Sequence, residues 1–242
     1  MNASRTIDLN ADLGEGFPFD LALLDRVSSA NVSCGAHAGD ELTMLFTLSA
    51  ARDRSVVVGA HPGYDDREYF GRRELSLKRK EIVNLIYKQM SRILKIADRE
   101  NVRVRYVKPH GALYNQAQHD KTVARAIVDA IAPLGLPIVG QPDSVIEEIA
   151  RENGLRFVRE GFIDRRYATD GRLVARTEPN AILTDPIEIE DQIFRLIDSG
   201  FETLCLHGDD PRAVESADLV LRILNDRGVT VQSFLRREGE AS

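Results

Sequence analysis

Four histidines stand in equivalent places, each shortly after a segment with the pattern of a β-strand and close to a glycine or a proline. They are His37, His61, His110 and His207. The fifth histidine, His119, stands at a predicted helix start, and we expect it to be a surface residue. Because an imidazole changes its charge near neutral pH, it can serve as a general acid or base. Four histidines at equivalent strand ends predict one shared site.

Carboxylates occur in the same strand-end clusters, and they are Asp12, Glu15, Asp40 and Asp209. Together with the histidines they could carry out hydrolysis or the opening of a ring. The same groups could hold a divalent ion that polarises a carbonyl or activates water, with Asp12, His37 and His61 as the first choice of ligands. No HExxH-like signature fixes such an ion, so the sequence leaves a metal open.

Cationic side chains belong to the same clusters. Lys108 precedes a proline, and Arg72 and Arg73 follow a glycine, so all three could bind a carboxylate or a phosphate of a substrate. Alternatively, the two arginines pair with nearby acidic residues, namely Asp65, Asp66 or Glu68. The sequence leaves both interpretations open.

Two further groups also have alternative roles. Glu160, Asp164 and Arg165 follow a later strand, where they could form part of the site or a structural ion-pair network. Cys34 could be a nucleophile only if its thiolate were activated, and a buried apolar role is the simpler interpretation. Because Cys34 and Cys205 are the only cysteines, we expect free thiols rather than a disulfide framework.

The elements that must position these residues alternate along the chain between short β-branched runs and longer amphipathic segments. The predicted strands are Thr6–Asn10, Asn31–Gly35, Ser55–Ala60, Arg103–Lys108, Leu136–Gly140, Leu155–Arg159, Ala181–Leu183, Phe201–Leu206 and Gly228–Ser233. Two of them are the weakest: Ala181–Leu183 is short, and Leu155–Arg159 could instead be a hairpin partner. The predicted helices are Glu41–Arg54, Lys80–Glu100, Asp120–Ala132, Ser144–Asn153, Glu188–Ser199 and Arg212–Arg227.

This alternation predicts an α/β fold, a (β/α) barrel with seven or eight mostly parallel strands. In such a barrel the loops at the carboxyl ends of the strands converge on one mouth, where catalytic residues come from several strands. At 242 residues, we expect a single domain over 1–235 and a frayed tail over 236–242.

Composition excludes several classes of protein. The net charge is -6 and the basic residues are dispersed, which argues against a nucleic-acid partner. No apolar run is long enough for a membrane span or a signal peptide, so we expect a cytoplasmic protein. Neither GxxxxGK[ST] nor GxGxxG occurs, so any ATP dependence requires an unusual site or a partner chain.

A set of seven ordered motifs resembles that of the LamB/YcsF family, the group of 5-oxoprolinase A subunits. The motifs are IDLNADLGEG, SANVSCGAHAGD, VVVGAHPGYDD, FGRRE, VKPHGALYN, EGFIDRRYATDGRLVAR and LCLHGDDP, and they extend from about Ile7 to about Val231. The family pattern carries over onto Asn10, Asp12, Glu15, His37, Asp40, His61, Lys108, His110, Asp164, Arg165, His207 and Asp209.

The resemblance implies a glycoside hydrolase/deacetylase-like barrel. It also implies a reaction in which 5-oxoproline, ATP and water give L-glutamate, ADP and phosphate, with two partners, the B and C subunits. ATP is then expected as its magnesium complex. On this basis we expect catalytic roles for Asp12, His37, His61, His110, Lys108 and His207. We expect substrate-binding roles for Asn10, Glu15, Asp40, Arg72, Arg73, Asp164, Arg165 and Asp209.

A lactam is a resonance-stabilised amide, and its coupling to ATP suggests that the carbonyl oxygen is phosphorylated before a base-activated water opens the ring. Our hypothesis is that this chain supplies the mouth where the activated ring is hydrolysed. Two other functions stay open: a metal-dependent deacetylase or amidohydrolase acting on a sugar-like amide, and a non-catalytic component that binds a metabolite. A homo-oligomer is compatible with each of them.

Overall fold

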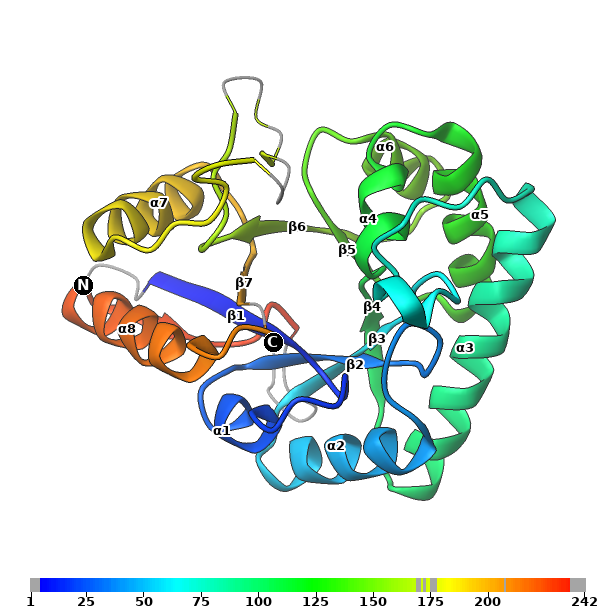
Figure 1. Ribbon diagram of the computed structural model, residues 1–242, viewed down its shortest axis with the longest axis horizontal. Coiled ribbons are helices and arrows are strands. Elements are labelled where there is room, and N and C mark those ends of the chain that lie inside the picture. Colours follow the sequence, from blue (N-terminus) through cyan, green and yellow to red (C-terminus); the bar gives the residue numbers. More distant parts are fainter. Residues whose placement is uncertain (1–4, 169–170, 172, 175–177, 207, 236–242) are drawn as a thin grey trace.

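The computed structural model describes residues 5–168, 171, 173–174, 178–206 and 208–235, and these residues form a barrel of parallel strands surrounded by helices (Figure 1). The strands are β1 (Arg5–Leu13), β2 (Ser29–Ser33), β3 (Val57–His61), β4 (Val104–Val107), β5 (Ile138–Gly140), β6 (Phe157–Phe162), β7 (Thr203–Leu206) and β8 (Val229–Val231). Strands β2 to β7 pair in chain order, β7 pairs with β1, and a further pairing of β1 with β2 closes the ring. The predicted (β/α) barrel is therefore confirmed.

The ring closes on β1 because this strand is long enough to pair with three neighbouring strands. Its first residues, Arg5–Ile7, pair with β8, while Asp8–Ala11 pair with β7 and Asn10–Leu13 pair with β2. β8 thus joins β1 below the point where β2 begins. The chain contributes an eighth strand to the sheet without widening the ring of seven.

Helices cover the outside of the barrel (Figure 1). They are α1 (Asp20–Leu24), α2 (Glu41–Asp53), α3 (Arg79–Arg99), α4 (Gly111–Ala117), α5 (Lys121–Ile131), α6 (Val145–Glu152), α7 (Pro186–Asp198) and α8 (Ala213–Asp226), with 3-10 turns at Arg67–Tyr69 and Ala132–Leu134. None of the helices in the described ranges is long and apolar enough to cross a membrane.

All predicted strands but one coincide with strands of the sheet. Leu155–Arg159 overlaps β6, which pairs in parallel with both β5 and β7 and is no hairpin partner. The prediction of a strand at Ala181–Leu183 was wrong: Ile182 forms only an isolated antiparallel bridge with Arg165. The single-domain extent of 1–235 stays a prediction, and the predicted tail, 236–242, lies outside the described residues.

Helices α1 and α4 were not predicted. Each has fewer than two turns of clear apolar period, since α1 is five residues long and α4 is seven. Helix α4 also begins at Gly111, a residue that normally disfavours helix, directly after His110. Both short helices are held by tertiary packing, because Leu23 and Leu24 of α1 and Leu113 of α4 are fully or almost fully buried.

The side chains of β1 that point into the barrel are polar. On β1, alternate side chains point to opposite faces, so Asp8, Asn10 and Asp12 share one face. Their hydrogen bonds reach residues of the two neighbouring strands, β7 and β2: Asn10 donates to Thr203 (2.7 Å), and Asp12 accepts from Asn31 (2.8 Å). The intervening apolar residues of β1 belong to the main hydrophobic core under the helices. This alternation places hydrophilic groups in line with the barrel mouth.

Tyr106 of β4 fills the lumen below these polar residues. Its ring packs against Phe234 (5.2 Å between ring centres), and its hydroxyl donates to Asn31 (2.7 Å). A Cβ on Gly59 of β3 would lie 2.2 Å from the Tyr106 ring, so only glycine leaves room for it. The lower end of the barrel is closed, and the site is confined to the mouth.

Candidate functional site

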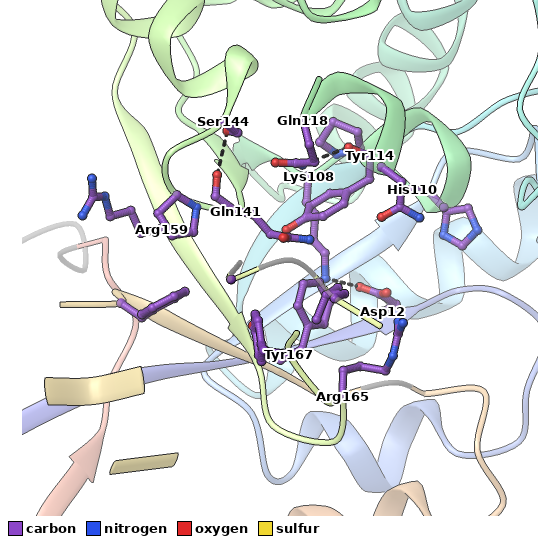
Figure 2. A pocket seen from close by; sticks show the side chains of 18 of the residues that line it. Asp12, Lys108, His110, Tyr114, Gln118, Gln141, Ser144, Arg159, Arg165 and Tyr167 are labelled. Carbon is purple, nitrogen blue, oxygen red and sulfur yellow. Dashed lines mark hydrogen bonds and ion pairs between the residues drawn. The ribbon is translucent and has the colours of Figure 1, made fainter. Parts of the chain in front are cut away.

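A cavity of about 1020 Å³ opens at the carboxyl ends of the strands (Figure 2). Residues from successive strand ends line it, as the sequence predicted, among them Asp12, Glu15, His61, Lys108, His110, Phe162 and Asp209. In Figure 2, Tyr114 and Gln118 lie on one side of the cavity and Arg165 and Tyr167 on the other. The cavity brings together most of the predicted site residues that the structure describes.

Lys108 forms the centre of an ion-pair network at the inner end of the cavity. It follows β4, and its Nζ lies 2.9 Å from Oδ1 of Asp12, 2.8 Å from Oε1 of Glu160 and 3.1 Å from Sγ of Cys205. Burial alone would lower the pKa of Lys108, but the surrounding anionic groups raise it well above 10.5. The ammonium is therefore charged at neutral pH and compensates the two carboxylates.

Two asparagines orient this network. Asn31 donates to Asn10 Oδ1 (2.6 Å) and to Asp12 Oδ1 (2.8 Å), while Asn10 donates to Glu160 Oε1 (3.1 Å). Asn10 and Asn31 are buried, so both amides act as fixed dipoles between charged groups. Asn10 therefore orients the residues of the site from below and does not line the cavity.

Three of the four predicted histidines form a compact buried cluster with Glu15. The rings of His37 and His110 stack with centres 3.7 Å apart, and Nε2 of His61 lies 3.0 Å from Nδ1 of His110. Glu15 approaches all three, with Oε1 3.1 Å from Nε2 of His37. His207 falls outside the described residues.

The environment of the cluster disfavours the charged forms of His37, His110 and Glu15. Burial, followed by the two neighbouring histidines, holds the pKa of His37 well below 6.5, and burial and His61 lower the pKa of His110 to about 3. Burial and nearby carboxylates raise the pKa of Glu15 well above 4.5. Neutral imidazoles have a free lone pair, which makes them able to bind a metal ion.

One candidate metal site is present among the described residues. Glu15, His37, His61 and His110 each offer a ligand atom, and these atoms all lie within 4.8 Å of one another. His37 and His61 were among the residues first chosen from the sequence. Asp12 is not in the set, although its Oδ2 lies 3.4 Å from Nε2 of His61.

Glycine makes the close packing of this cluster feasible. Gly71, from the FGRRE motif, has φ +64°, and a Cβ there would lie 2.7 Å from Cβ of His37 and 3.0 Å from the His110 ring. The carbonyl of the preceding residue, Phe70, accepts a hydrogen bond from Nε2 of His110 (2.8 Å). The loop after β3 thus packs directly against the histidines.

Among the predicted arginines, Arg72 and Arg165 reach the cavity. Arg72 forms an ion pair with Asp209 across the mouth, and both residues line it. Arg165 also lines the cavity and donates to the carbonyl of Val174 (2.7 Å). Asp164 does not line the cavity, and its backbone carbonyl accepts from the N–H of Leu183 (2.8 Å).

Two predicted substrate-binding residues have structural contacts away from the cavity. Asp40 is the N-cap of α2, where its side chain accepts hydrogen bonds from the backbone and the hydroxyl of Thr43 (2.8 Å each). Arg73 pairs with Asp66 (2.9 Å), which was the alternative that the sequence left open. His119 is exposed, as predicted, and lies at the edge of the cavity.

The sequence did not assign several residues that the fold brings to this site. For Glu160 the sequence left two roles open, part of the site or part of an ion-pair network, and it gave no sign that the partner is Lys108. Asn31 was not singled out at all, although its place between Ser29 and Ser33 puts all three on one face of β2. Tyr114 lies in the KPHGALYN motif, one helical turn after His110, and that spacing was the available signal.

Cys34 does not have the environment of a nucleophile. It is fully buried, and burial raises the pKa of its thiol to about 12. A thiol with this pKa is protonated at neutral pH, which supports the apolar role over the catalytic one.

Comparison with known proteins finds relatives that match almost the whole length of the chain. The family model of the LamB/YcsF family matches residues 7–239. The chain is 40% identical over 250 residues to a 5-oxoprolinase A subunit of Pseudomonas syringae pv. tomato, the one numbered 3, covering 95% of this chain and 98% of that one. It is 40% identical over 245 residues to the 5-oxoprolinase A subunit of Pyrococcus furiosus, and the match covers 93% of this chain and 96% of that one.

Solved structures agree. The lactam utilization protein from Thermus thermophilus superposes with a TM-score of 0.88 at 37% identity, covering 95% of this chain and all of that one. A family 4 carbohydrate esterase from Streptomyces lividans superposes with a TM-score of 0.53 at 11% identity, covering 98% and 97%, which shows a related barrel fold and no more. By its matched motifs, its relatives and its barrel, the chain belongs to the LamB/YcsF family.

Proposed function

We propose that this chain is the A subunit of an ATP-dependent 5-oxoprolinase, which cleaves 5-oxoproline to L-glutamate together with the B and C subunits. The observation that carries this proposal is the identity of about 40% with proteins of that name, over 93% or more of this chain. A cavity of about 1020 Å³ lined by charged and titratable groups favours a catalytic role over a purely binding one. The chain is proposed to act in the cytoplasm.

In this proposal the lactam lies at the mouth with its carboxylate toward the arginines of the outer wall. Arg72 and Arg165 both line the cavity, and a guanidinium group can bind a carboxylate through two hydrogen bonds. A small anionic substrate would then compete with Asp209 for Arg72, because these two side chains already form an ion pair. The ring would be held between these arginines and the polar floor of the barrel.

Asp12 is the proposed general base for the water that opens the ring. Its side chain reaches the cavity, while Lys108 and Asn31 both bind its Oδ1 and leave Oδ2 toward the histidines. The charged ammonium of Lys108 favours the carboxylate form of Asp12, which is the form that accepts a proton. The proton that Asp12 takes from the water can then pass to the nitrogen that is released as the ring opens.

ATP is proposed to activate the lactam carbonyl by phosphorylation, as its magnesium complex and within the assembled complex of subunits. The cavity volume is at the upper end of the roughly 300–1,000 Å³ of small-molecule sites, so there is room for more than a five-membered ring. The sequence has no phosphate-binding loop of a common type. We therefore propose that the partner subunits take part in binding ATP.

The test is glutamate release from 5-oxoproline with ATP and magnesium, using the chain alone and then mixed with the B and C subunits. We expect activity in the mixture only, and we expect it to require ATP. Asp12→Asn should abolish that activity, while His119→Ala, a change at an exposed edge of the cavity, should retain it. A mixture that assembles but releases no glutamate would contradict the proposal.

A metal-dependent amidohydrolase is the second candidate, because one Glu and three His side chains offer ligand atoms within 4.8 Å of one another. This function requires hydrolysis of an N-acetylated sugar by the isolated chain, with a metal ion and without ATP. The same preparation tests both functions, since ATP-independent release of acetate would favour the second candidate over the first.

A further inference from the structure

We propose that Glu15, His61 and His110 bind one transition-metal dication at the edge of the cavity, and that His37 positions Glu15 rather than binding the metal. This inference does not depend on the proposed function, because it concerns the isolated chain.

The tautomers of two histidines follow from their backbone partners. Nδ1 of His61 lies 2.7 Å from the carbonyl oxygen of Lys108, and Nε2 of His110 lies 2.8 Å from that of Phe70. A carbonyl only accepts hydrogen bonds, so each of these nitrogens donates its N–H outward. In the neutral imidazoles, the inner nitrogens, Nε2 of His61 and Nδ1 of His110, therefore both carry lone pairs.

These two inner nitrogens face each other at 3.0 Å. Two lone pairs at that distance repel unless a cation lies between or beside them. The outward hydrogen bonds are also the contacts that metal-bound histidines usually make, since a bonded second nitrogen fixes the ring and its tautomer. The arrangement of His61 and His110 is thus that of a metal-binding pair.

Glu15 completes a triangle of ligand atoms. Its Oε1 lies 3.4 Å from Nδ1 of His110 and 3.9 Å from Nε2 of His61. Ligands about 2.1 Å from a tetrahedral ion lie about 3.4 Å from one another, so the three sides of the triangle are close to the required spacing. The carboxylate would also supply negative charge against the dication.

His37 differs from the other two histidines in its geometry. Its ring is parallel to that of His110, with an angle of 2° between their planes and centres 3.7 Å apart, so the in-plane lone pairs of the two rings cannot converge on one ion. Its Nε2 lies 3.1 Å from Oε1 of Glu15, a distance suited to donating a hydrogen bond. Unlike Glu15, His61 and His110, it does not line the cavity. His37 is therefore assigned as a positioning residue.

Three protein ligands with an open side are typical of catalytic rather than structural metal sites. Here the open side faces the cavity, where Asp12 lies with its Oδ2 3.4 Å from Nε2 of His61. Two imidazoles and a carboxylate favour zinc, cobalt, nickel, iron or manganese, whereas magnesium prefers oxygen ligands. The site would thus be separate from the magnesium that accompanies ATP.

The first experiment uses the wild-type chain freed of metal with a chelator and then titrated with Co²⁺ alone. We expect one equivalent to bind, with visible absorption bands of a four- or five-coordinate ion that Zn²⁺ abolishes and Mg²⁺ does not. We also expect Zn²⁺ to raise the Tm by about 5 °C or more, because it binds only the folded chain. Absence of Co²⁺ binding at micromolar concentration would overturn the proposed site. A proton shared between His61 and His110 would then be the explanation for their facing nitrogens.

Variants separate the ligands from the positioning residue. Glu15→Gln and His110→Ala should lose stoichiometric binding and the bands, while His119→Ala should bind Co²⁺ as the wild type does. The amide nitrogen of His37→Gln reaches the position of Nε2 and keeps a donor toward Glu15, so we expect unchanged band positions and an affinity lowered about 10–100-fold at most. If the bands of His37→Gln shift, His37 is a ligand and its assignment is wrong. If the bands persist in both Glu15→Gln and His110→Ala, the metal lies elsewhere.

Discussion

Nζ of Lys108 lies 2.9 Å from Oδ1 of Asp12, and this ion pair connects the floor of the barrel to its mouth. The Lys108 side chain is 3% exposed, whereas the Asp12 side chain keeps 11% of its surface exposed. Both residues line the cavity, and Asp12 is the more accessible member of the pair.

Replacing Asp12 by Asn should reduce kcat of the reconstituted enzyme by about 10²–10⁴-fold, because an amide cannot accept a proton from water. The shape and the hydrogen bond from Asn31 would be kept, so the melting temperature should change little. Steady-state kinetics with the B and C subunits would measure the loss. A wild-type kcat for Asp12→Asn would show that Asp12 is not the general base.

Replacing Lys108 by Met should destabilise the chain by roughly 3–5 kcal/mol, because Glu160 would be left as a buried charge without its cation and Asp12 would lose its ion pair. Glu160 is fully buried, so it cannot regain hydration by a small movement. Denaturant unfolding measures the loss. Adding Glu160→Gln to Lys108→Met should recover part of it, and a double variant as unstable as the single one would argue against this electrostatic cause.

Asp8 should make stability depend on pH. Burial raises its pKa to about 6, against 3.8 in the unfolded chain, even though three hydroxyl groups donate to it. The folded state thus holds this proton more tightly than the unfolded chain does. The stabilisation that Asp8 contributes is therefore present below about pH 4 and is lost as pH rises through 6.

Comparison with Asp8→Asn isolates this effect, since an asparagine at this position does not titrate. The unfolding free energy of the wild type relative to the variant should fall by about 2 kcal/mol between pH 4 and pH 7. Urea unfolding at a series of pH values measures it. A difference that is constant across this range would show that Asp8 does not hold a proton in the folded state.

Asp40→Ala should lower stability and leave catalysis unchanged, because the Asp40 side chain caps α2 and does not line the cavity. Loss of an N-cap should reduce the Tm by about 2–4 °C. Asp120→Ala, which removes the equivalent cap of α5, is the matched control. A rise in KM for Asp40→Ala alone would restore the substrate-binding role expected from the sequence.

The β/α alternation and the position of the polar clusters determined most of the fold and the location of the site. Parallel strands joined by helices converge at one end whatever their detailed packing, which is why His37, His61, His110 and Lys108 could be brought to one mouth from their strand-end positions alone. The short helices α1 and α4 could not be predicted in this way, since tertiary contacts rather than their own period hold them.

Only the tertiary structure decided which neighbours these side chains have. The pairing of Lys108 with Glu160 joins β4 to β6, and the facing nitrogens of His61 and His110 depend on carbonyls of Lys108 and Phe70. Asp40, a few residues after His37, belongs to the same motif but caps a helix instead. Sequence position determines the end of the barrel at which a residue lies, whereas the direction of its side chain and the identity of its partner depend on packing between strands distant in the chain.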